Sequence, residues 1–232
     1  MFLPVYASLD WTWLLVLLAA LLGFAAQAAV QNRYNQYSRV LAASGVPAGQ
    51  AALSLLSQAG VQGVSLEPSS RPGLSDHYDP RSRTLRLSQG VYGSSSIAAL
   101  GIAAHEAGHA IQHDQGYLPL RIRNAVVPVV SFASNLSMPL FLVGLLLGFA
   151  QLAMVGAVLY AFAVAFQLIT LPVEFDASRR ALDALESGGF LTREELPGAR
   201  KVLTAAACTY VAAALVSIAQ LIRLTSLADR RR

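Results

Sequence analysis

Long stretches without a charged residue divide this chain. The first lies between Asp10 and Arg33, where 22 consecutive residues carry no charge. Because a helix of about 20 apolar residues crosses a hydrocarbon core about 30 Å thick, this stretch predicts a spanning helix. A cleaved signal peptide is the alternative, but the basic segment that opens such a peptide is missing here. We therefore expect an N-terminal transmembrane helix.

The longest uncharged stretch runs from Asn124 to Val173 and contains 50 residues. Its length fits two crossings joined by a short turn, which we place near Gly148 to Gln151. Pro128 and Pro139 predict an irregular first arm, part of which could line a cavity or lie at the membrane interface. A last apolar run, from Val202 to Ile222, could span the membrane or pack against the other helices.

Shorter patterns follow the first apolar stretch. Pro47 to Ala59 predicts a short helix with Pro in its first turn and Gly60 as its C-terminal stop. The segments Val64 to Glu67 and Thr84 to Ser88 predict short strands around a turn at Asp76 to Pro80. Together they indicate a small sheet.

Two further helices are predicted by their N-terminal residues. Ser95 or Ser96 can cap a helix that runs from Ile97 to Asp114 and consists almost entirely of Ala, Ile, Leu and Gly apart from its His and Glu residues. Asp176 can start another helix that continues through Glu186.

The composition agrees with a membrane protein. The chain is 55% hydrophobic and only 13% charged, whereas about a quarter of the residues are charged in soluble domains. Of its 17 basic residues only Lys201 is a lysine, and they are mixed with acids or flank apolar runs, which argues against a nucleic-acid partner. The single cysteine, Cys208, excludes an intramolecular disulfide and a cysteine-based metal finger.

Candidate chemistry gathers in the predicted helix 97–114. His105 and His109 are four residues apart, so at about 3.6 residues per turn both project from one face and can bind one metal ion. Glu106 lies beside the open coordination position, where it can accept a proton from water. With four His and six Glu in the chain, chance would produce the pattern His-Glu-x-x-His, formed here by His105, Glu106 and His109, about 0.002 times per chain. A cation also explains a carboxylate among apolar residues, which would be costly to bury unpaired.

A catalytic zinc usually takes three protein ligands. The long metzincin motif is excluded, because Gln112 and Gln115 stand where it needs Gly and His. His113 lies on the ligand face one turn further on, where we expect it to support the site or line its rim. Glu174 is the best third ligand, because two crossings return it to the side of the membrane that holds His105. The alternative is that it is merely the first polar residue after a membrane helix. Asp176 is a candidate to orient a ligand imidazole.

Several sequence blocks together resemble the YugP-type neutral zinc metallopeptidases, which are bacterial membrane proteins. The blocks are His105 to Gln112, the preceding Asp76 to Pro80 and Leu87 to Tyr92, and the later Leu171 to Ala181. The resemblance extends over nearly the whole chain. It implies a zinc-dependent peptidase of the gluzincin kind with one Zn²⁺ per chain, His105, His109 and Glu174 as ligands, and Glu106 as catalytic base.

This reading predicts hydrolysis of a protein or peptide substrate by a zinc-activated water, with Glu106 taking and returning the proton. The strand Thr84 to Ser88 could hold an extended substrate by edge pairing. His77 and Tyr78 are candidates for oxyanion or substrate contacts, although packing of the small sheet is the simpler role for two turn residues.

The predicted fold is a mainly α membrane protein with three to four transmembrane helices and a small α+β zincin-like catalytic lobe. We divide it into an N-terminal transmembrane helix (1–32), a catalytic lobe (33–123), a transmembrane hairpin (124–173), a third-ligand segment with a short helix (174–201), and a C-terminal apolar helix with a basic tail (202–232).

Arginines flank the apolar stretches on one side, which by the positive-inside rule is cytoplasmic. They are Arg33, Arg39, Arg121, Arg123, Arg179 and Arg180. This bias predicts the bacterial inner membrane with the candidate site in the cytoplasm. The tail Arg230 to Arg232 opposes it if the final helix crosses, so either that helix does not span or the bias upstream overrides the tail.

Two other functions remain open from the sequence. An intramembrane protease of the site-2 kind also uses this histidine motif, but its metal helix spans the bilayer, and here too few apolar residues precede His105. A catalytically silent, zinc-stabilised membrane adaptor is the second, and the intact Glu106 argues against it.

Overall fold

A computed structural model describes residues 10–70, 73 and 75–230, and within these residues the chain forms seven helices and one three-stranded sheet. The described chain divides into two compact units. The first, which we call the helical unit, comprises Met1–Ala26, Ile122–Leu171 and Thr209–Arg232, and the second, the mixed unit, comprises Gln27–Arg121 and Pro172–Cys208. The predicted fold class, mainly helical with a small sheet, is confirmed.

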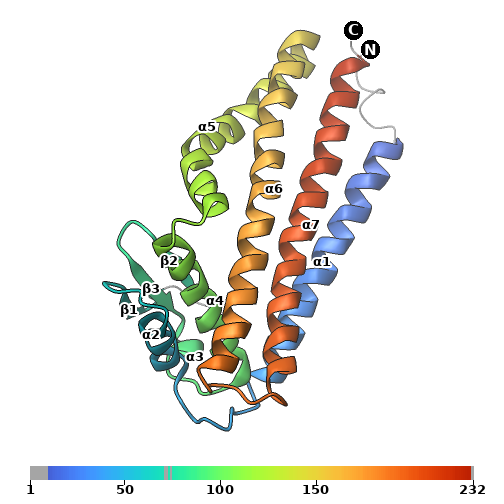
Figure 1. The fold of residues 1–232 in the computed structure, drawn as a ribbon. Helices are drawn as coiled ribbons and strands as arrows, with labels where there is room; N and C mark the ends of the chain where they lie inside the picture. The colour runs from blue at the N-terminus through green and yellow to red at the C-terminus, as the bar shows by residue number, and fades with distance from the viewer. Residues whose placement is uncertain (1–9, 71–72, 74, 231–232) are drawn as a thin grey trace. The chain divides into compact units, whose positions relative to one another are not determined.

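Four of the described helices are long and apolar enough to cross a membrane (Figure 1). They are α1 (Trp11–Tyr37), α5 (Leu118–Leu147), α6 (Ala150–Ser187) and α7 (Leu196–Asp229). Each exceeds the roughly 20 residues that a crossing needs. The final apolar run, which the sequence left undecided, is therefore a fourth candidate span.

The helical unit contains parts of two helices, α5 and α6, joined by a short turn at the place that the sequence predicted. Gly148, with a φ of 74°, lies in the turn that ends α5 and leads into α6. Gly144 and Gly156 have no side chain, and this lets the two helix backbones approach each other closely near Ala153 and Phe141. Residues of α5, α6 and α7 form a shared apolar core: Phe141, Leu145, Ala153, Ala157, Leu224 and Ala228.

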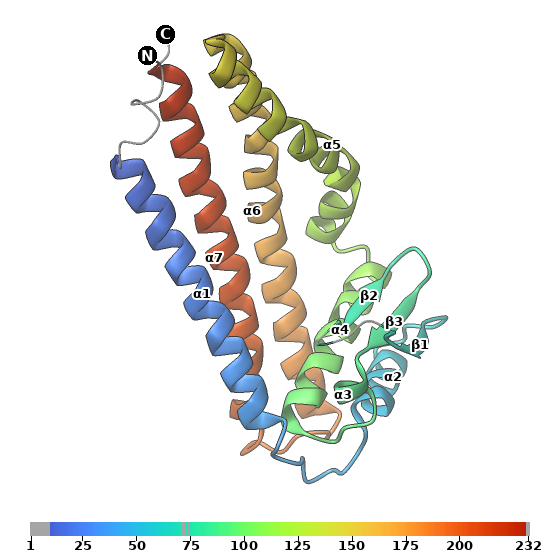
Figure 2. The ribbon, with the colours of Figure 1, turned by 180° about the vertical axis from the view of Figure 1, so that it is seen from behind.

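The first arm of the hairpin remains one helix although Pro128 and Pro139 lie inside it. Figure 2 shows the change of direction that α5 makes along its length. Proline removes one backbone hydrogen bond and commonly kinks a helix, so the expected irregularity takes the form of a bend.

The start of α1 lies against the end of α7 in the helical unit. Asp10 Oδ2 lies 2.8 Å from Arg230 Nη1 and Asp10 Oδ1 lies 3.7 Å from Arg223 Nη1, while the Arg223 guanidinium stacks over the Trp13 ring. These contacts place the first and last described helix ends side by side. Of the predicted basic tail, Arg230 is described and Arg231 and Arg232 lie outside the described residues.

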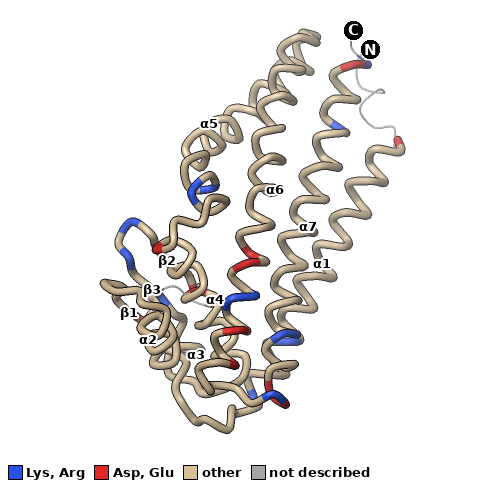
Figure 3. Tube along the Cα trace, viewed as in Figure 1, with Lys and Arg blue, Asp and Glu red and all other residues tan. Residues whose placement is uncertain are grey.

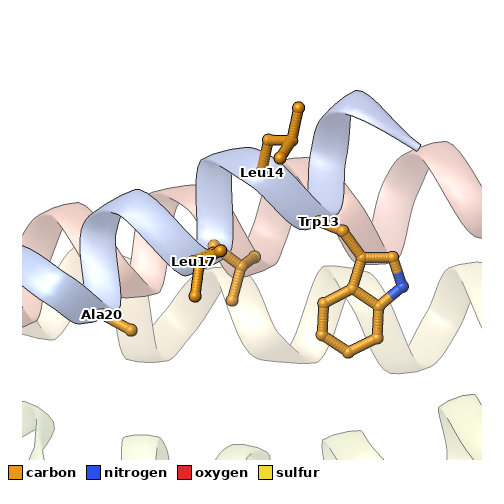
Figure 4. Close-up of a pocket in the computed structure, with 5 residues that line it drawn as sticks. Trp13, Leu14, Leu17 and Ala20 are labelled. Carbon is orange, nitrogen blue, oxygen red and sulfur yellow. The ribbon is translucent and has the colours of Figure 1, made fainter. Parts of the chain in front are cut away.

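One face of α1 is apolar and exposed. An apolar hollow on this face is lined by Trp13, Leu14, Val16, Leu17 and Ala20, four of which are labelled in Figure 4. It contains none of the predicted metal ligands, and exposed apolar side chains of this kind suit contact with lipid.

The mixed unit contains the small sheet and the shorter helices. These are α2 (Ala48–Gln58), β1 (Ser65–Pro68), β2 (His77–Asp79), β3 (Thr84–Leu87), α3 (Gln89–Tyr92) and α4 (Ile97–Asp114). Helix α4 packs against α2, α3 and the sheet. The predicted cap is confirmed, because the Ser96 side chain accepts a hydrogen bond from the Ala99 N–H.

The sheet order corrects one expectation. Strand β3 is central, with β1 parallel on one side and β2 antiparallel on the other. The proposal that the strand Thr84 to Ser88 pairs with a substrate is therefore wrong, because both of its edges are occupied. Strand β2 is an edge strand.

A second correction concerns Asp176. It does not start a helix, since α6 continues without a break from Ala150 to Ser187 and includes Pro172. A proline inside a helix removes one hydrogen bond and does not have to end it. Glu174 and Asp176 thus lie within a continuous helix.

Candidate metal centre

The site lies where α4 and α6 approach each other in the mixed unit. Ala103, Ala104 and Ala107 of α4 are buried, and Gly108 lies directly against the Ala177 backbone of α6: a Cβ at position 108 would be 2.8 Å from the Ala177 oxygen. Small residues therefore let the helix that carries the two histidines contact the helix that carries Glu174.

His105, His109 and Glu174 converge, with one donor atom from each lying within 4.8 Å of the others. Glu174 Oε2 is 3.3 Å from His105 Nε2 and 3.6 Å from His109 Nε2. Three ligands at zinc bond lengths of about 2.0–2.1 Å in a tetrahedral arrangement lie about 3.3–3.4 Å apart. Two imidazole nitrogens and one carboxylate at these distances fit a zinc ion with one position left open.

The surroundings of this triad favour a positive charge. The side chain of Glu174 is 3% exposed and those of His105 and His109 are 14% and 12% exposed. Burial lowers the pKa of His109, but its hydrogen bond to Glu174 and the negative charges of Glu106 and Glu174 outweigh burial, so the pKa lies above its ordinary value. A cation in place of this proton would satisfy the same carboxylates.

The other ring nitrogen of each histidine has a protein partner. His105 Nδ1 lies 3.1 Å from Ser178 Oγ, and His109 Nδ1 lies 3.0 Å from Gln112 Oε1. With both Nδ1 atoms engaged outside the triad, both Nε2 atoms remain directed at Glu174. Support of this kind is usual for metal-binding histidines.

Glu106 is held beside the triad by the edge strand. Its Oε2 accepts a hydrogen bond of 3.0 Å from the Tyr78 N–H of β2. The same tyrosine reaches His113, with 2.9 Å between its hydroxyl oxygen and Nδ1. Burial raises the pKa of Tyr78, so its hydroxyl stays protonated near neutral pH and can donate.

Asp176 lies behind the site. Its Oδ2 accepts from Gln112 Nε2 at 2.9 Å and from Arg180 Nε at 2.5 Å, and its Oδ1 accepts from Arg179 Nη2 at 2.5 Å. It therefore connects to His109 through the Gln112 amide. Figure 3 shows the acidic and basic positions that follow one another here on α6, after a first part of the helix without charge.

The structure separates the remaining predicted site residues from the triad. His113 contacts Tyr78, and the His77 ring nitrogen Nδ1 lies 2.8 Å from the Ser75 carbonyl oxygen. The sequence predicted a turn at His77 and Tyr78, but both lie in strand β2. Sequence reasoning missed two residues that contact the ligand imidazoles, Ser178 and Gln112. The sequence gives a signal for Gln112, which follows His109 by three residues and so lies on the same side of α4. It gives none for Ser178.

Comparison with known proteins supplies the family. The family model described as "Putative neutral zinc metallopeptidase" matches residues 12–229, which include all three triad residues. The chain belongs to this family. The "Putative membrane protease YugP" of Bacillus subtilis (strain 168) is 48% identical over 202 residues, which cover 87% of this chain and 89% of that relative. No solved structure matches the chain.

The resemblance inferred from the sequence blocks is thereby confirmed. The family description, the relative's printed name and the four candidate spans agree on a membrane protein of the zinc metallopeptidase class. Among the described residues, His105, His109 and Glu174 form a cluster that could hold a metal ion, and all three lie within the part of the chain that the family model matches.

Proposed function

We propose that this protein is a membrane-embedded zinc metalloendopeptidase of the gluzincin type. His105, His109 and Glu174 hold one Zn²⁺ per chain, and Glu106 acts as the catalytic base. The observation that carries the proposal is the convergence of three donor atoms within 4.8 Å, contributed by two helices far apart in sequence, with a second acidic residue, Glu106, beside them.

When bound, zinc would polarise the scissile carbonyl and lower the pKa of water towards about 7. Glu106 takes the proton from the attacking water and transfers it to the departing amine. The Tyr78 N–H holds one oxygen of this carboxylate and leaves the other for the water. No covalent bond between enzyme and substrate is needed.

The place for an extended peptide is the edge of β2 that faces away from β3, because this edge lies beside Glu106. In an antiparallel pair, alternate residues direct their backbone groups to opposite sides. The Tyr78 N–H contacts Glu106, so this backbone position faces the catalytic base and not β3. Because the Tyr78 N–H is already donated to Glu106, the outward group left for a substrate on this edge is the Tyr78 carbonyl oxygen, which could accept from a substrate N–H whatever the side chains of that substrate.

Charge along the chain supports a site in the cytoplasm of a bacterial cell. The candidate spans α1, α5, α6 and α7 would place the catalytic residues on one side, and the arginines that flank the spans on that side mark it as cytoplasmic. Four crossings put the start of α1 and the end of α7 together on the opposite side. The contacts of Asp10 with Arg223 and Arg230 support that arrangement.

This topology predicts the labelling of single cysteines in a Cys208→Ala background. Ser82→Cys and Ser187→Cys should resist a membrane-impermeant thiol reagent in intact cells and react after permeabilisation, whereas Asp229→Cys should react in intact cells. All three positions are exposed. Reaction of only one of the first two would contradict the hairpin, and the reverse of the whole pattern would invert the topology.

Metal content tests the proposal itself. The purified protein should carry about one zinc per chain, and Glu174→Ala should lose most of it, because two imidazoles alone leave an incomplete site. Zinc is measured by elemental analysis after dialysis. The matched control is Glu186→Ala on the same helix, an exposed acid at its C-terminal end, which should keep full zinc. Full zinc in Glu174→Ala would remove Glu174 from the ligand set.

The length and position of α4 argue against an intramembrane protease of the site-2 kind. Its metal-binding helix must span the membrane, but α4 has 18 residues and is not among the candidate spans found in the described residues. Most of its length is buried among α2, α3 and the sheet of the mixed unit.

A further inference from the structure

A buried glutamine separates the carboxylate of Asp176 from the ligand imidazole of His109. Gln112 is fully buried, at 0% exposure, and each polar atom of its side chain has a partner. Its Oε1 lies 3.0 Å from His109 Nδ1, and its Nε2 donates to the Val173 carbonyl oxygen and to Asp176 Oδ2, both at 2.9 Å. In many metal sites a carboxylate contacts the imidazole directly, and here an amide stands between them.

The orientation of this amide is fixed by its surroundings. The Val173 carbonyl and the Asp176 carboxylate are both acceptors, so the NH₂ group must face them. A rotated amide would place its oxygen against two other oxygens in a buried space, which is strongly unfavourable. Arg179 and Arg180 hold the Asp176 carboxylate in its place and keep it charged.

The fixed amide allows a neutral His109 only one tautomer, the one with its hydrogen on Nδ1. Because Oε1 can only accept, His109 must carry a hydrogen on Nδ1, and Nε2 is then the nitrogen whose lone pair can face a metal. Ser178 differs, since a hydroxyl can donate or accept and so imposes no choice on His105.

We propose that Gln112 is a positioning residue that selects the Nδ1–H tautomer of His109 and so directs Nε2 to the metal, with Asp176 and the Val173 carbonyl setting the polarity of its amide. The inference rests on the zinc site proposed above. The two residues that contact the Nδ1 atoms therefore have different roles. Gln112 selects the tautomer of His109, and Ser178 forms a hydrogen bond with His105 without selecting its tautomer.

Zinc affinity in competition with a chromophoric chelator tests the inference. Gln112→Met, which has a similar volume and no acceptor of comparable strength, should bind zinc about 10–100-fold more weakly than the wild type. Ser178→Ala should weaken binding less. Gln115→Met is the matched control, because Gln115 is exposed and contacts Arg180 of the same network but no imidazole, and it should bind like the wild type.

Two measurements distinguish positioning from a general loss of structure. The visible spectrum of the Co²⁺-substituted protein should change in Gln112→Met and stay unchanged in Gln115→Met. In the zinc-loaded wild type labelled with ¹⁵N-histidine, the His109 signal should show a hydrogen on Nδ1, and this readout is taken with Gln112 in place. Replacing His77 and His113 one at a time assigns their signals, and Ser178→Ala identifies the signal of His105, because Ser178 contacts His105 and not His109.

The outcomes separate the two proposals. Wild-type zinc affinity in Gln112→Met, an equal loss in Ser178→Ala, or a hydrogen on Nε2 of His109 would each overturn the role of Gln112 and leave the zinc site standing. Absence of zinc binding by the wild type would overturn the site and the inference together.

Discussion

Replacing Glu106 with glutamine should abolish peptide hydrolysis and leave the zinc content of the protein unchanged. Glutamine keeps the size of the side chain and can still accept the Tyr78 N–H bond through its amide oxygen, but it cannot take a proton from water. General-base catalysis commonly contributes about 10²- to 10⁴-fold, so the rate should fall at least that far. Cleavage of a quenched fluorescent peptide in detergent micelles measures the rate, and elemental analysis measures the zinc.

Glu186→Gln is the matched control for this experiment. Glu186 is an exposed glutamate near the end of α6, and its substitution should change neither rate nor zinc content. Equal hydrolysis by Glu106→Gln and the wild type would remove the catalytic role of Glu106. If a cellular function also survived in Glu106→Gln, the protein would be the silent adaptor that the sequence left open.

The elements with strong local signals were predictable. Uncharged stretches marked the spans, Gly148 marked the hairpin turn, and Ser96 marked the start of α4. The spacing of His105 and His109 defined one face of a helix, and counting the expected crossings predicted that Glu174 returns to them, which agrees with the 3.3 Å between Glu174 Oε2 and His105 Nε2. Periodicity and charge are properties of neighbouring residues along the chain, so they can be recognised in a single sequence.

Features that depend on contacts between elements were not predictable. Strand β3 lies between β1 and β2 in the sheet, and no local pattern in the sequence encodes this order. Asp176 suggested a helix start because aspartate is a favoured N-cap residue and this one follows an apolar run, yet α6 continues without a break through Pro172. The role of Gln112 appears only when Val173 and Asp176 lie against it, more than 60 residues away in sequence.

The close approach of α4 and α6 gives the last prediction. Gly108→Ala should weaken zinc binding and lower the hydrolysis rate, because the new Cβ would lie 2.8 Å from the Ala177 backbone oxygen and one helix must move away. His109 is the next residue on α4, and Glu174 is one turn before Ala177 on α6, so that movement separates ligands. Misplacement of catalytic groups by about 1 Å can cost about 10²-fold in rate. Overpacking costs typically 1–3 kcal/mol of folding stability.

Gly101→Ala is a control on the same helix, and we expect it to raise folding stability where the clash in Gly108→Ala lowers it. A Cβ there would lie 3.5 Å from the Ala199 Cβ, an ordinary contact, so alanine should add its helix preference of about 1 kcal/mol without a clash. The same preference partly offsets the clash at position 108, so zinc affinity reports the effect more clearly than thermal stability does. We expect Gly101→Ala to bind zinc like the wild type and to melt at the same or a higher temperature. Equal zinc affinities in Gly108→Ala and Gly101→Ala would show that the distance between α4 and α6 does not set the geometry of the site.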